Sequence, residues 1–536
     1  MKESSGLSRF HFVVLFVTLF LISESKLWPN AQAATDRPNI LVILADDLGY
    51  GDVQCFNPKS RIPTPHLNQM AAEGSRFIDA HSPSTVCTPT RYSLLTGRMA
   101  FRTGYRGVFT GVGGPCLIEA DRLTLGGMLQ SSGYRTAMSG KWHIGMTFYD
   151  GQSQPIHRDG LEPVRRVDFS RPSTDGPVHR GFDRFFGTVC CPTTDWLYAY
   201  VVDDSIPIPP TGLLDREQLP KHPWSFDNRQ GLVAPDFDLE EVDLVFLEKS
   251  QEFLKQHARE HPDQPFFLFH SMQAVHLPSF PSPRFQGKTD FGPHADFIFE
   301  MDYVVGQLMA TLRETGMDKN TMVIFTSDNG PEVGTVIEMR GRHQHDGAYP
   351  WRGMKRDNWE GGHRVPTIVW WPSVIESGSE VDQTICLTDL FATIADIIGY
   401  ELPNDAAEDS FSFYPLLRGQ KSDEIRPYTL HQTISLALAI RRGKWKFLNH
   451  QGSGGNSYSR GRLLPFALPN TLPTAPAQLY DLEQDPGETV NLYEKYPKVA
   501  EELKQLLDLS IAKGRSAPVR KQMGVEKSQG APSDGK

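Results

Sequence analysis

The sequence predicts an α/β fold, in which a large, mostly parallel sheet is flanked by helices, followed by a small C-terminal α+β domain with an antiparallel sheet. Three observations support this prediction. Apolar runs typical of buried strands alternate with segments of helical periodicity, and two of these runs lead directly into acidic pairs. After about residue 418 the pattern changes to short strands, which indicates a second, smaller domain.

Residues 1–33 are expected to be a signal peptide. Basic residues precede an apolar run over 12–22, which is shorter than the roughly 20 residues that a membrane-spanning helix needs. The small-x-small pattern over 31–33 predicts cleavage before Ala34. An uncleaved membrane anchor is the alternative, and no later stretch is long and apolar enough to cross a membrane. We therefore expect an exported protein without stable membrane insertion.

Charge and cysteine content narrow the class of protein further. The net charge is −10, and no strongly basic cluster favours nucleic-acid binding. Six cysteines in 536 residues are too few for a disulfide scaffold, and if one is chemically special, at most two internal bridges can form. The chain has no Asn-x-Ser/Thr acceptor, so we expect a periplasmic or secreted bacterial protein. The oligomeric state stays open.

The first domain is predicted over residues 34–417. Strands are expected at 39–45, 134–139, 265–270, 322–326 and 367–371. Helices are expected at 66–77, 124–131, 297–315 and 387–398. Segments 147–180 and 203–235 are rich in Pro and Gly, which is typical of long surface insertions around a site.

The C-terminal part is predicted as an α+β subdomain over 418–513. It would contain strands at 436–440 and 444–448 and a helix at 499–512. The polar residues 514–536 are expected to form a disordered tail.

Acidic pairs follow two of the predicted strands, Asp46-Asp47 after the first and Asp328-Asn329 after a later one. Carboxylates at the ends of buried strands point into the crevice where α/β folds bind ligands. Four oxygen donors without Cys or His suit Ca²⁺ or Mg²⁺. Each pair alone is more typical of a turn or a helix cap, whereas two such pairs together favour a metal site.

The segment 86–91 predicts a helix that begins beside a cysteine. Thr88 can cap the helix and Pro89 suits its first turn, so Cys87 would lie at the N-terminus. That end of a helix is partly positive and binds anions. Arg91 follows one turn later on the same face and can hold an oxyanion bidentately. The alternative is a buried structural cysteine in a capped helix.

This Cys-x-Pro-x-Arg pattern, continued by Thr-Gly-Arg at 96–98, resembles the signature of the sulfatase family, within the alkaline-phosphatase-like superfamily. The resemblance implies an alkaline-phosphatase-like sheet. It also implies conversion of Cys87 to Cα-formylglycine by a transiently bound formylglycine-generating maturation enzyme. Thr88 and Thr90 stand where Ser is commoner in the family; a small hydroxyl residue is kept, so conversion is still expected.

Further blocks that resemble the family occur in its order, from about residue 37 to 512. They are Asp46-Asp47, 140–145, 273–278, Asp328-Asn329, 352–366, and 479–482 with 485–488. The resemblance implies one Ca²⁺ or Mg²⁺ held by Asp46, Asp47, Asp328, Asn329 and the modified Cys87. It implies sulfate-binding roles for Arg91, Lys141 and Lys355. His143 would lie beside the formylglycine and His276 near the leaving group.

The activity that the resemblance implies is hydrolysis of sulfate monoesters. One hydroxyl of the hydrated aldehyde would attack sulfur to give a covalent sulfo-enzyme, and the second would expel sulfate. His276 is the candidate acid and His143 the candidate base, although the two roles can be exchanged. A sulfated carbohydrate is preferred over an aryl sulfate as the substrate.

Two alternatives remain. One is a phosphonate or phosphate monoester hydrolase of the same superfamily. Zinc-dependent relatives place a His after the second metal Asp, and Asn329 at that position counts against their branch. The other is a non-catalytic carbohydrate-binding relative, although the presence of Cys87 and every expected ligand counts against it.

Overall fold

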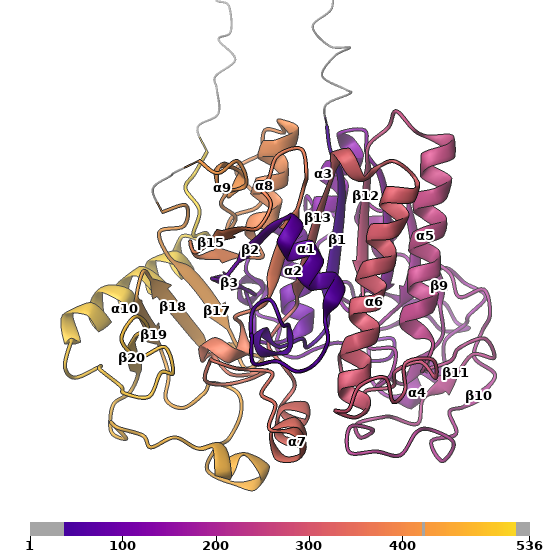
Figure 1. Cartoon of the computed structure of the whole chain (residues 1–536). Coiled ribbons are helices and arrows are strands. Elements are labelled where there is room, and N and C mark those ends of the chain that lie inside the picture. Colours follow the sequence, from indigo (N-terminus) through magenta and orange to yellow (C-terminus); the bar gives the residue numbers. More distant parts are fainter. Residues whose placement is uncertain (1–36, 421–423, 521–536) are drawn as a thin grey trace, which may run out of the picture. The chain divides into compact units, whose positions relative to one another are not determined.

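A nine-stranded sheet forms the centre of the structure, a computed structural model that describes residues 37–420 and 424–520 (Figure 1). Its strands are, in spatial order, β15 (Ser379–Val381), β2 (Ser75–Phe77), β14 (Thr367–Trp370), β13 (Thr321–Ser327), β1 (Asn39–Ala45), β12 (Phe266–Ser271), β4 (Arg135–Lys141), β7 (Arg184–Thr188) and β9 (Val201–Val202). The five strands from β13 to β7 are parallel, and the pairs β13–β14, β14–β2 and β7–β9 are antiparallel. The predicted α/β class is confirmed, with antiparallel pairing toward both edges.

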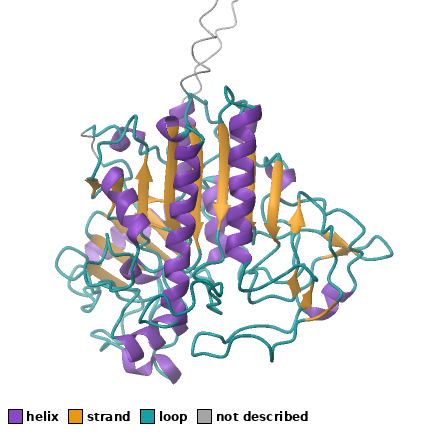
Figure 2. Ribbon diagram, turned by 45° about the vertical axis from the view of Figure 1, so that its right-hand side comes forward, coloured by secondary structure: helices purple, strands orange, loops and turns teal. Residues whose placement is uncertain are grey.

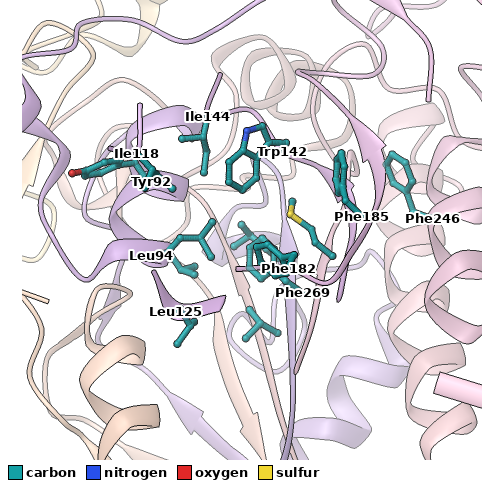
Figure 3. Packing of buried hydrophobic residues seen from close by; sticks show 14 of the residues in the cluster. Tyr92, Leu94, Ile118, Leu125, Trp142, Ile144, Phe182, Phe185, Phe246 and Phe269 are labelled. Carbon is teal, nitrogen blue, oxygen red and sulfur yellow. The ribbon is translucent and has the colours of Figure 1, made fainter. Parts of the chain in front are cut away.

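Helices cover both faces of this sheet (Figure 2). One face carries α1 (Pro65–Glu73) and α6 (Pro293–Glu314), with α5 (Val242–Glu260) alongside α6. The other carries α2 (Cys87–Thr96), α3 (Leu125–Ser131) and α8 (Asp389–Ile398). Because side chains alternate along a strand, Ile40, Val42 and Leu44 of β1 pack on the α2 side, and Leu41 and Ile43 pack on the α6 side. β1 is therefore buried on both faces, as its continuous apolar run predicts. Figure 3 shows part of the core on the α2 side, around Trp142 and Phe269.

The Pro- and Gly-rich insertions contain only short elements. These are β5 (Phe148–Tyr149), β6 (Pro155–Ile156), α4 (Leu161–Arg165), β10 (Gly212–Leu213) and β11 (Leu232–Val233), the last pairing with β8 (Leu197–Tyr198). Outside these insertions, β3 (Ala80–His81) pairs with β16 (Ile385–Cys386), and two further helices are α7 (Val333–His343) and α9 (Tyr414–Leu417). No helix within the described residues has the length and apolar character needed to cross a membrane.

A separate four-stranded antiparallel sheet lies in the C-terminal part, as predicted. Its strands, in order, are β17 (Thr429–Gln432), β18 (Leu438–Arg442), β19 (Trp445–Leu448) and β20 (Gln478–Asp481). Helix α10 (Pro497–Ala512) covers it, with Leu503 and Leu507 packed against Ile440 and Phe447.

Three expectations are corrected or limited by the structure. The helix predicted over 66–77 ends at Glu73, and its last three residues form β2, because they pair with β14 and β15. Residues 514–520, predicted as disordered, pack on the segment 404–409, where Ser516 donates to Asp409 at 2.7 Å. All six cysteines are free thiols, so no disulfide forms. The predicted signal peptide and residues 521–536 lie outside the described residues.

Between the two sheets lies a buried cluster of three imidazoles. His81 Nε2 lies 2.7 Å from Asp79 Oδ1, and His81 Nδ1 lies 3.0 Å from His363 Nδ1. The ring of His431 stacks on that of His363 with centroids 3.8 Å apart. Burial lowers the pKa of all three histidines, so their rings are neutral at pH 7.

Charged groups surround these rings. Lys446 lies 3.0 Å from Glu360 and 2.9 Å from Glu488. Arg364 and Arg441 both pair with Asp79. Three cations thus face three carboxylates around three neutral imidazoles, and this arrangement joins the C-terminal sheet to the main sheet.

Candidate active site

The two acidic pairs lie side by side because their strands are paired in register. Ala45, the last residue of β1, is opposite Ser327, the last residue of β13, and the Asp328 N–H donates to the Ala45 carbonyl at 3.1 Å. The Asp47 N–H donates to Asp328 Oδ1 at 3.2 Å, and Asn329 Nδ2 donates to Asp47 Oδ1 at 2.7 Å. The sequence prediction of convergent pairs at the strand ends thus holds in the structure.

The donor set fits a hard divalent cation. Asp46 Oδ1 and Asn329 Oδ1 are buried and have no hydrogen-bond partner, a costly state for polar oxygens unless an ion satisfies them. Ligand atoms of Asp46, Asp47 and His276 lie within 4.8 Å of one another. Burial raises the pKa of Asp328, and the Asp46 charge raises it further. Crowded, desolvated carboxylates of this kind are the usual setting for Ca²⁺ or Mg²⁺.

Cys87 is the first residue of α2 and is only 2% exposed. Burial raises the pKa of the Cys87 thiol, and the positive charges of Lys141 and Lys355 only partly oppose this rise. The unmodified side chain is therefore a neutral thiol. The predicted capping role of Thr88 is wrong. Val86 is the N-cap residue, and the Thr88 hydroxyl instead donates to the His143 carbonyl at 2.8 Å, which ties the start of α2 to the loop after β4.

Arg91 extends from α2 into the same cluster, where its side chain is 1% exposed. Its Nε and one terminal nitrogen donate to Asp328 Oδ2 at 3.0 and 2.8 Å. Its other terminal nitrogen donates to Ser271 Oγ at 2.5 Å and to the Lys141 carbonyl at 3.1 Å. The sequence led us to expect that this guanidinium binds an oxyanion. In the structure its hydrogen bonds go to the Asp328 carboxylate and to groups at the ends of β12 and β4.

Two lysines add positive charge on either side of the acidic pairs. The Lys141 ammonium, at the end of β4, contacts Asp46 Oδ2, and the Lys355 ammonium lies 2.8 Å from Asp47 Oδ2. Burial disfavours both ammonium charges, but the carboxylates outweigh it and raise the pKa of each lysine. Both side chains are therefore charged, although buried.

His143 lies beneath the start of α2 and is fully buried. Its Nε2 is 2.7 Å from the Phe109 carbonyl, which can only accept, so Nε2 carries the proton and Nδ1 is left with a lone pair. Burial and the Lys141 charge hold the pKa of His143 well below 6.5. The Cys191 sulfur is 3.9 Å from both ring nitrogens.

His276 follows β12 in the chain and lies next to Asp47. Its Nδ1 is 2.5 Å from the Leu277 carbonyl, which leaves Nε2 facing Asp47 Oδ2 at 3.5 Å. Burial together with the Lys355 charge lowers the pKa of His276 to about 4, so the ring is neutral in the free protein.

Glycines allow the loop that carries Lys355 to lie against the second acidic pair. The Gly330 N–H donates to the Gly362 carbonyl at 3.0 Å. A Cβ on Gly330 would fall 1.9 Å from the Gly361 carbonyl oxygen, and one on Gly362 would fall 2.0 Å from the Asp357 oxygen. Backbone thus packs directly on backbone here, and no side chain fits.

The structure therefore gathers every residue predicted for the site around one buried cluster. Three neighbours were not predicted: Cys191 beside His143, and the pair Glu332 and Arg356 beside Lys355. The only sequence signal for this pair is its closeness to the motifs, since Arg356 follows Lys355 and Glu332 lies three residues after Asn329.

Comparisons of sequence and of structure find known proteins that resemble this chain. Residues 38–400 match the family model described as "Sulfatase". N-acetylgalactosamine-6-O-sulfatase of Bacteroides thetaiotaomicron is 30% identical over 92% of this chain and 96% of its own. Human arylsulfatase A is 32% identical over 91% of this chain and 92% of its own. A solved structure from work on glycosaminoglycan metabolism by Bacteroides thetaiotaomicron, at 28% identity, superposes with a TM-score of 0.74, covering 89% of this chain and 100% of that one.

Proposed function

The chain belongs to the sulfatase family and is a sulfuric ester hydrolase, and on this premise we propose that it cleaves sulfate monoesters of carbohydrates at the cluster around Cys87. The observation that carries the proposal is the meeting of Cys87, two buried ammonium groups and two unpartnered buried oxygens at the ends of β1 and β13. Such a set of groups is suited to a compact, doubly charged anion bound beside a cation.

Two groups absent from the polypeptide complete the proposed site. A Ca²⁺ or Mg²⁺ ion, held by Asp46, Asp47, Asp328, Asn329 and the modified residue 87, would supply Lewis-acid stabilisation of negative charge on oxygen. Conversion of Cys87 to Cα-formylglycine would supply a hydrated aldehyde, whose hydroxyl is a nucleophile that a buried neutral thiol does not provide. The helix N-terminus at residue 87 favours negative charge at that position.

The two lysines bind the sulfate group in this proposal. Each ammonium has one short carboxylate contact, and Nζ of lysine carries three donors, so each keeps hydrogens for sulfate oxygens. Arg91 contributes differently from the sequence expectation. Because its donors are engaged by Asp328, Ser271 and the β4 carbonyl, it adds positive charge and fixes the metal-ligand carboxylate in place.

The histidines move protons. Nε2 of His276 is the only ring nitrogen of that residue not tied to backbone, and it faces the acidic pairs, where it can protonate the leaving oxygen. A bound sulfate places negative charge beside Lys355 and raises the pKa of His276 from about 4, which lets the ring take up the proton it transfers. Nδ1 of His143 carries the lone pair of the ring, with the Cys191 sulfur 3.9 Å away, and is the candidate base.

The carbohydrate preference follows from similarity to N-acetylgalactosamine-6-O-sulfatase along nearly the full chain. We further propose that residues 1–33 direct export to the periplasm or beyond, and that a maturation enzyme binds transiently to convert Cys87. We also propose that residues 34–417 form the catalytic domain and that residues 418–513 form a C-terminal subdomain.

The test combines mass spectrometry with an activity assay. Peptide mass spectrometry of protein co-produced with a maturation enzyme should show loss of the Cys87 thiol in favour of the aldehyde. That preparation should release sulfate from N-acetylgalactosamine 6-sulfate, and a preparation in which residue 87 is still cysteine should not. Equal turnover by both preparations would overturn the proposal, as would faster release of phosphate from the matching phosphate ester.

A further inference from the structure

A charged pair, Glu332 and Arg356, lies at the edge of the cluster around Cys87. The side chains of Arg91, Lys141 and Lys355 are at most 4% exposed, whereas that of Arg356 is 35% exposed. Arg356 is therefore the cation of this group that solvent, and the part of a substrate beyond its sulfate, can reach.

Glu332 couples Arg356 to the sulfate-binding lysine. The guanidinium donates two hydrogen bonds to the Glu332 carboxylate, at 2.7 and 2.9 Å. Glu332 Oε2 also lies 3.5 Å from the Lys355 ammonium, and Glu332 Oε1 accepts from the Val333 N–H at the start of α7 at 2.9 Å. One carboxylate thus separates the Arg356 guanidinium from the Lys355 ammonium, and both are held in a fixed relative position.

The backbone of Arg356 is fixed in an unusual conformation. Its φ is 81°, a left-handed value that non-glycine residues rarely adopt, and its N–H donates to the Thr85 carbonyl at 2.9 Å. From the other side, Asn456 donates to the Lys355 carbonyl at 2.8 Å. Two other site residues, Asp47 and His143, also have a positive φ. Strain of this kind is retained where surrounding structure requires a side chain at one place, and it clusters at functional sites.

The donors that remain on Arg356 indicate what it binds. A guanidinium has five N–H donors and no acceptor, and two of the five are engaged by Glu332. The exposed donors suit acceptor oxygens in a planar fork. Glu332 neutralises the charge of Arg356, so the pair favours neutral oxygens, such as sugar hydroxyls and an acetamido carbonyl, over a second bare anion.

We infer that the Glu332–Arg356 pair is a specificity determinant that binds hydroxyl or acetamido oxygens of the sugar carrying the scissile sulfate. This inference rests on the proposed function. It assigns a binding partner to the sugar ring, which the groups proposed to bind and cleave the sulfate do not contact. A simple aryl sulfate lacks these oxygens, so the pair distinguishes sugar sulfates from aryl sulfates.

The test is Arg356→Asn, because asparagine tolerates a left-handed φ and keeps the backbone in place. Steady-state kinetics are measured on matured protein with N-acetylgalactosamine 6-sulfate and with 4-nitrophenyl sulfate. The expected result is a loss of about tenfold or more in kcat/KM for the sugar, mostly through KM, that exceeds any loss for the aryl sulfate by about the same factor. Glu332→Gln should also lower kcat/KM more for the sugar sulfate than for the aryl sulfate, because it weakens the ion pair that holds Arg356 in place.

The matched control is Arg342→Asn, which removes another arginine from a glutamate pair, with Glu338 on α7, where the arginine side chain is 53% exposed. This variant should leave kcat/KM unchanged for both substrates. Equal losses on both substrates in Arg356→Asn would show that the residue only supports Lys355, and no loss on the sugar would also overturn the inference. Wild-type protein that releases sulfate from neither compound would instead overturn the proposed function, and the inference with it.

Discussion

Arg91 donates two hydrogen bonds, at 3.0 and 2.8 Å, to a single oxygen of Asp328. The two residues come from different elements, the second turn of α2 and the end of β13, and both are buried. This pair joins the helix that begins with Cys87 to the strand end that carries two of the five proposed metal ligands, Asp328 and Asn329. The proposed nucleophile and the proposed metal ligands Asp328 and Asn329 are thereby held in a fixed relative position.

Arg91→Ala should destabilise the protein by about 3–5 kcal/mol, because it leaves the buried Asp328 carboxylate without its partner. Urea unfolding followed by circular dichroism measures this loss. Arg91→Lys keeps the charge but not the fork, so it should retain more stability and still lose activity. A stability loss below about 1 kcal/mol in Arg91→Ala would contradict the account of this pair.

Cys87→Ala should abolish sulfate release, with a fall in kcat/KM of at least about 10⁴-fold, since it removes the nucleophile. The free energy of unfolding should change by only about 1 kcal/mol, because one sulfur atom is lost from a small buried side chain. Cys116→Ala is the matched control, a buried cysteine outside the site, and should keep its activity. Measurable turnover by Cys87→Ala would exclude the nucleophilic role.

Chelation should remove both activity and part of the stability. A ligand that binds only the folded state stabilises it by about 2.7 kcal/mol at 100 times its Kd, so added Ca²⁺ or Mg²⁺ should raise the melting temperature of chelated protein. Asp46→Asn should lose most of this response. Isothermal titration with each ion then identifies the preferred one, and an absence of binding for both would refute the metal site.

Gly330→Ala should destabilise the protein by about 1–3 kcal/mol and lower kcat/KM, because the new Cβ would fall 1.9 Å from the Gly361 oxygen. The backbone next to Asn329 would have to move away from the loop that carries Lys355. Gly151→Ala provides the comparison, as its Cβ would meet nothing within 4 Å. Similar behaviour of the two variants in thermal unfolding and kinetics would disprove the packing argument.

Acid should destabilise the protein through the imidazole cluster. The folded-state pKa of His431 lies well below 6.5, so as the pH falls below 6.5 the unfolded chain binds a proton that the folded protein excludes. Each such histidine lowers the free energy of unfolding by about 1.4 kcal/mol per pH unit, until its folded-state pKa is reached.

The test of the cluster is His431→Phe, which keeps a flat ring to stack on His363 but cannot titrate. Urea unfolding between pH 6 and pH 5 gives the slope of the unfolding free energy against pH. In His431→Phe this slope should be smaller by about 1.4 kcal/mol per pH unit, the contribution of one proton. His179→Phe, at an exposed position, should leave the slope unchanged. An unaltered slope in His431→Phe would mean that this ring is already charged in the folded state.

The strand ends show what a sequence can predict. The run over 39–45 is apolar throughout because β1 is buried on both faces, and the polar pair that follows must then emerge at the edge of the sheet. The same holds for β13 and Asp328, so the meeting of the two polar pairs at one edge of the sheet was predictable from pattern alone. The roles of Cys87, Lys141 and Lys355 needed the family resemblance, since single residues in loops carry no periodicity.

What the sequence did not predict depends on contacts between distant segments. Thr88 looks like a helix cap, but the fold offers its hydroxyl the His143 carbonyl instead. Residues 75–77 continue a helical pattern, but pairing with β14 makes them a strand. The position of the Arg356 side chain depends on a left-handed φ and on the ion pair with Glu332. Neither feature can be predicted from the sequence pattern.

The burial of Cys87 has a consequence for the order of events during synthesis. The residue stands near the start of the chain, yet Asp328, whose pairing closes α2 against the sheet, comes 237 residues after Arg91. At a translation rate of about 5–20 residues per second, roughly 10–50 s pass between the emergence of these partners. In that interval the cysteine would be accessible to the proposed maturation enzyme, whereas in the closed fold its side chain is only 2% exposed. The proposed maturation of Cys87 would therefore have to precede closure of the fold, in a time window set by the distance along the chain between α2 and Asp328.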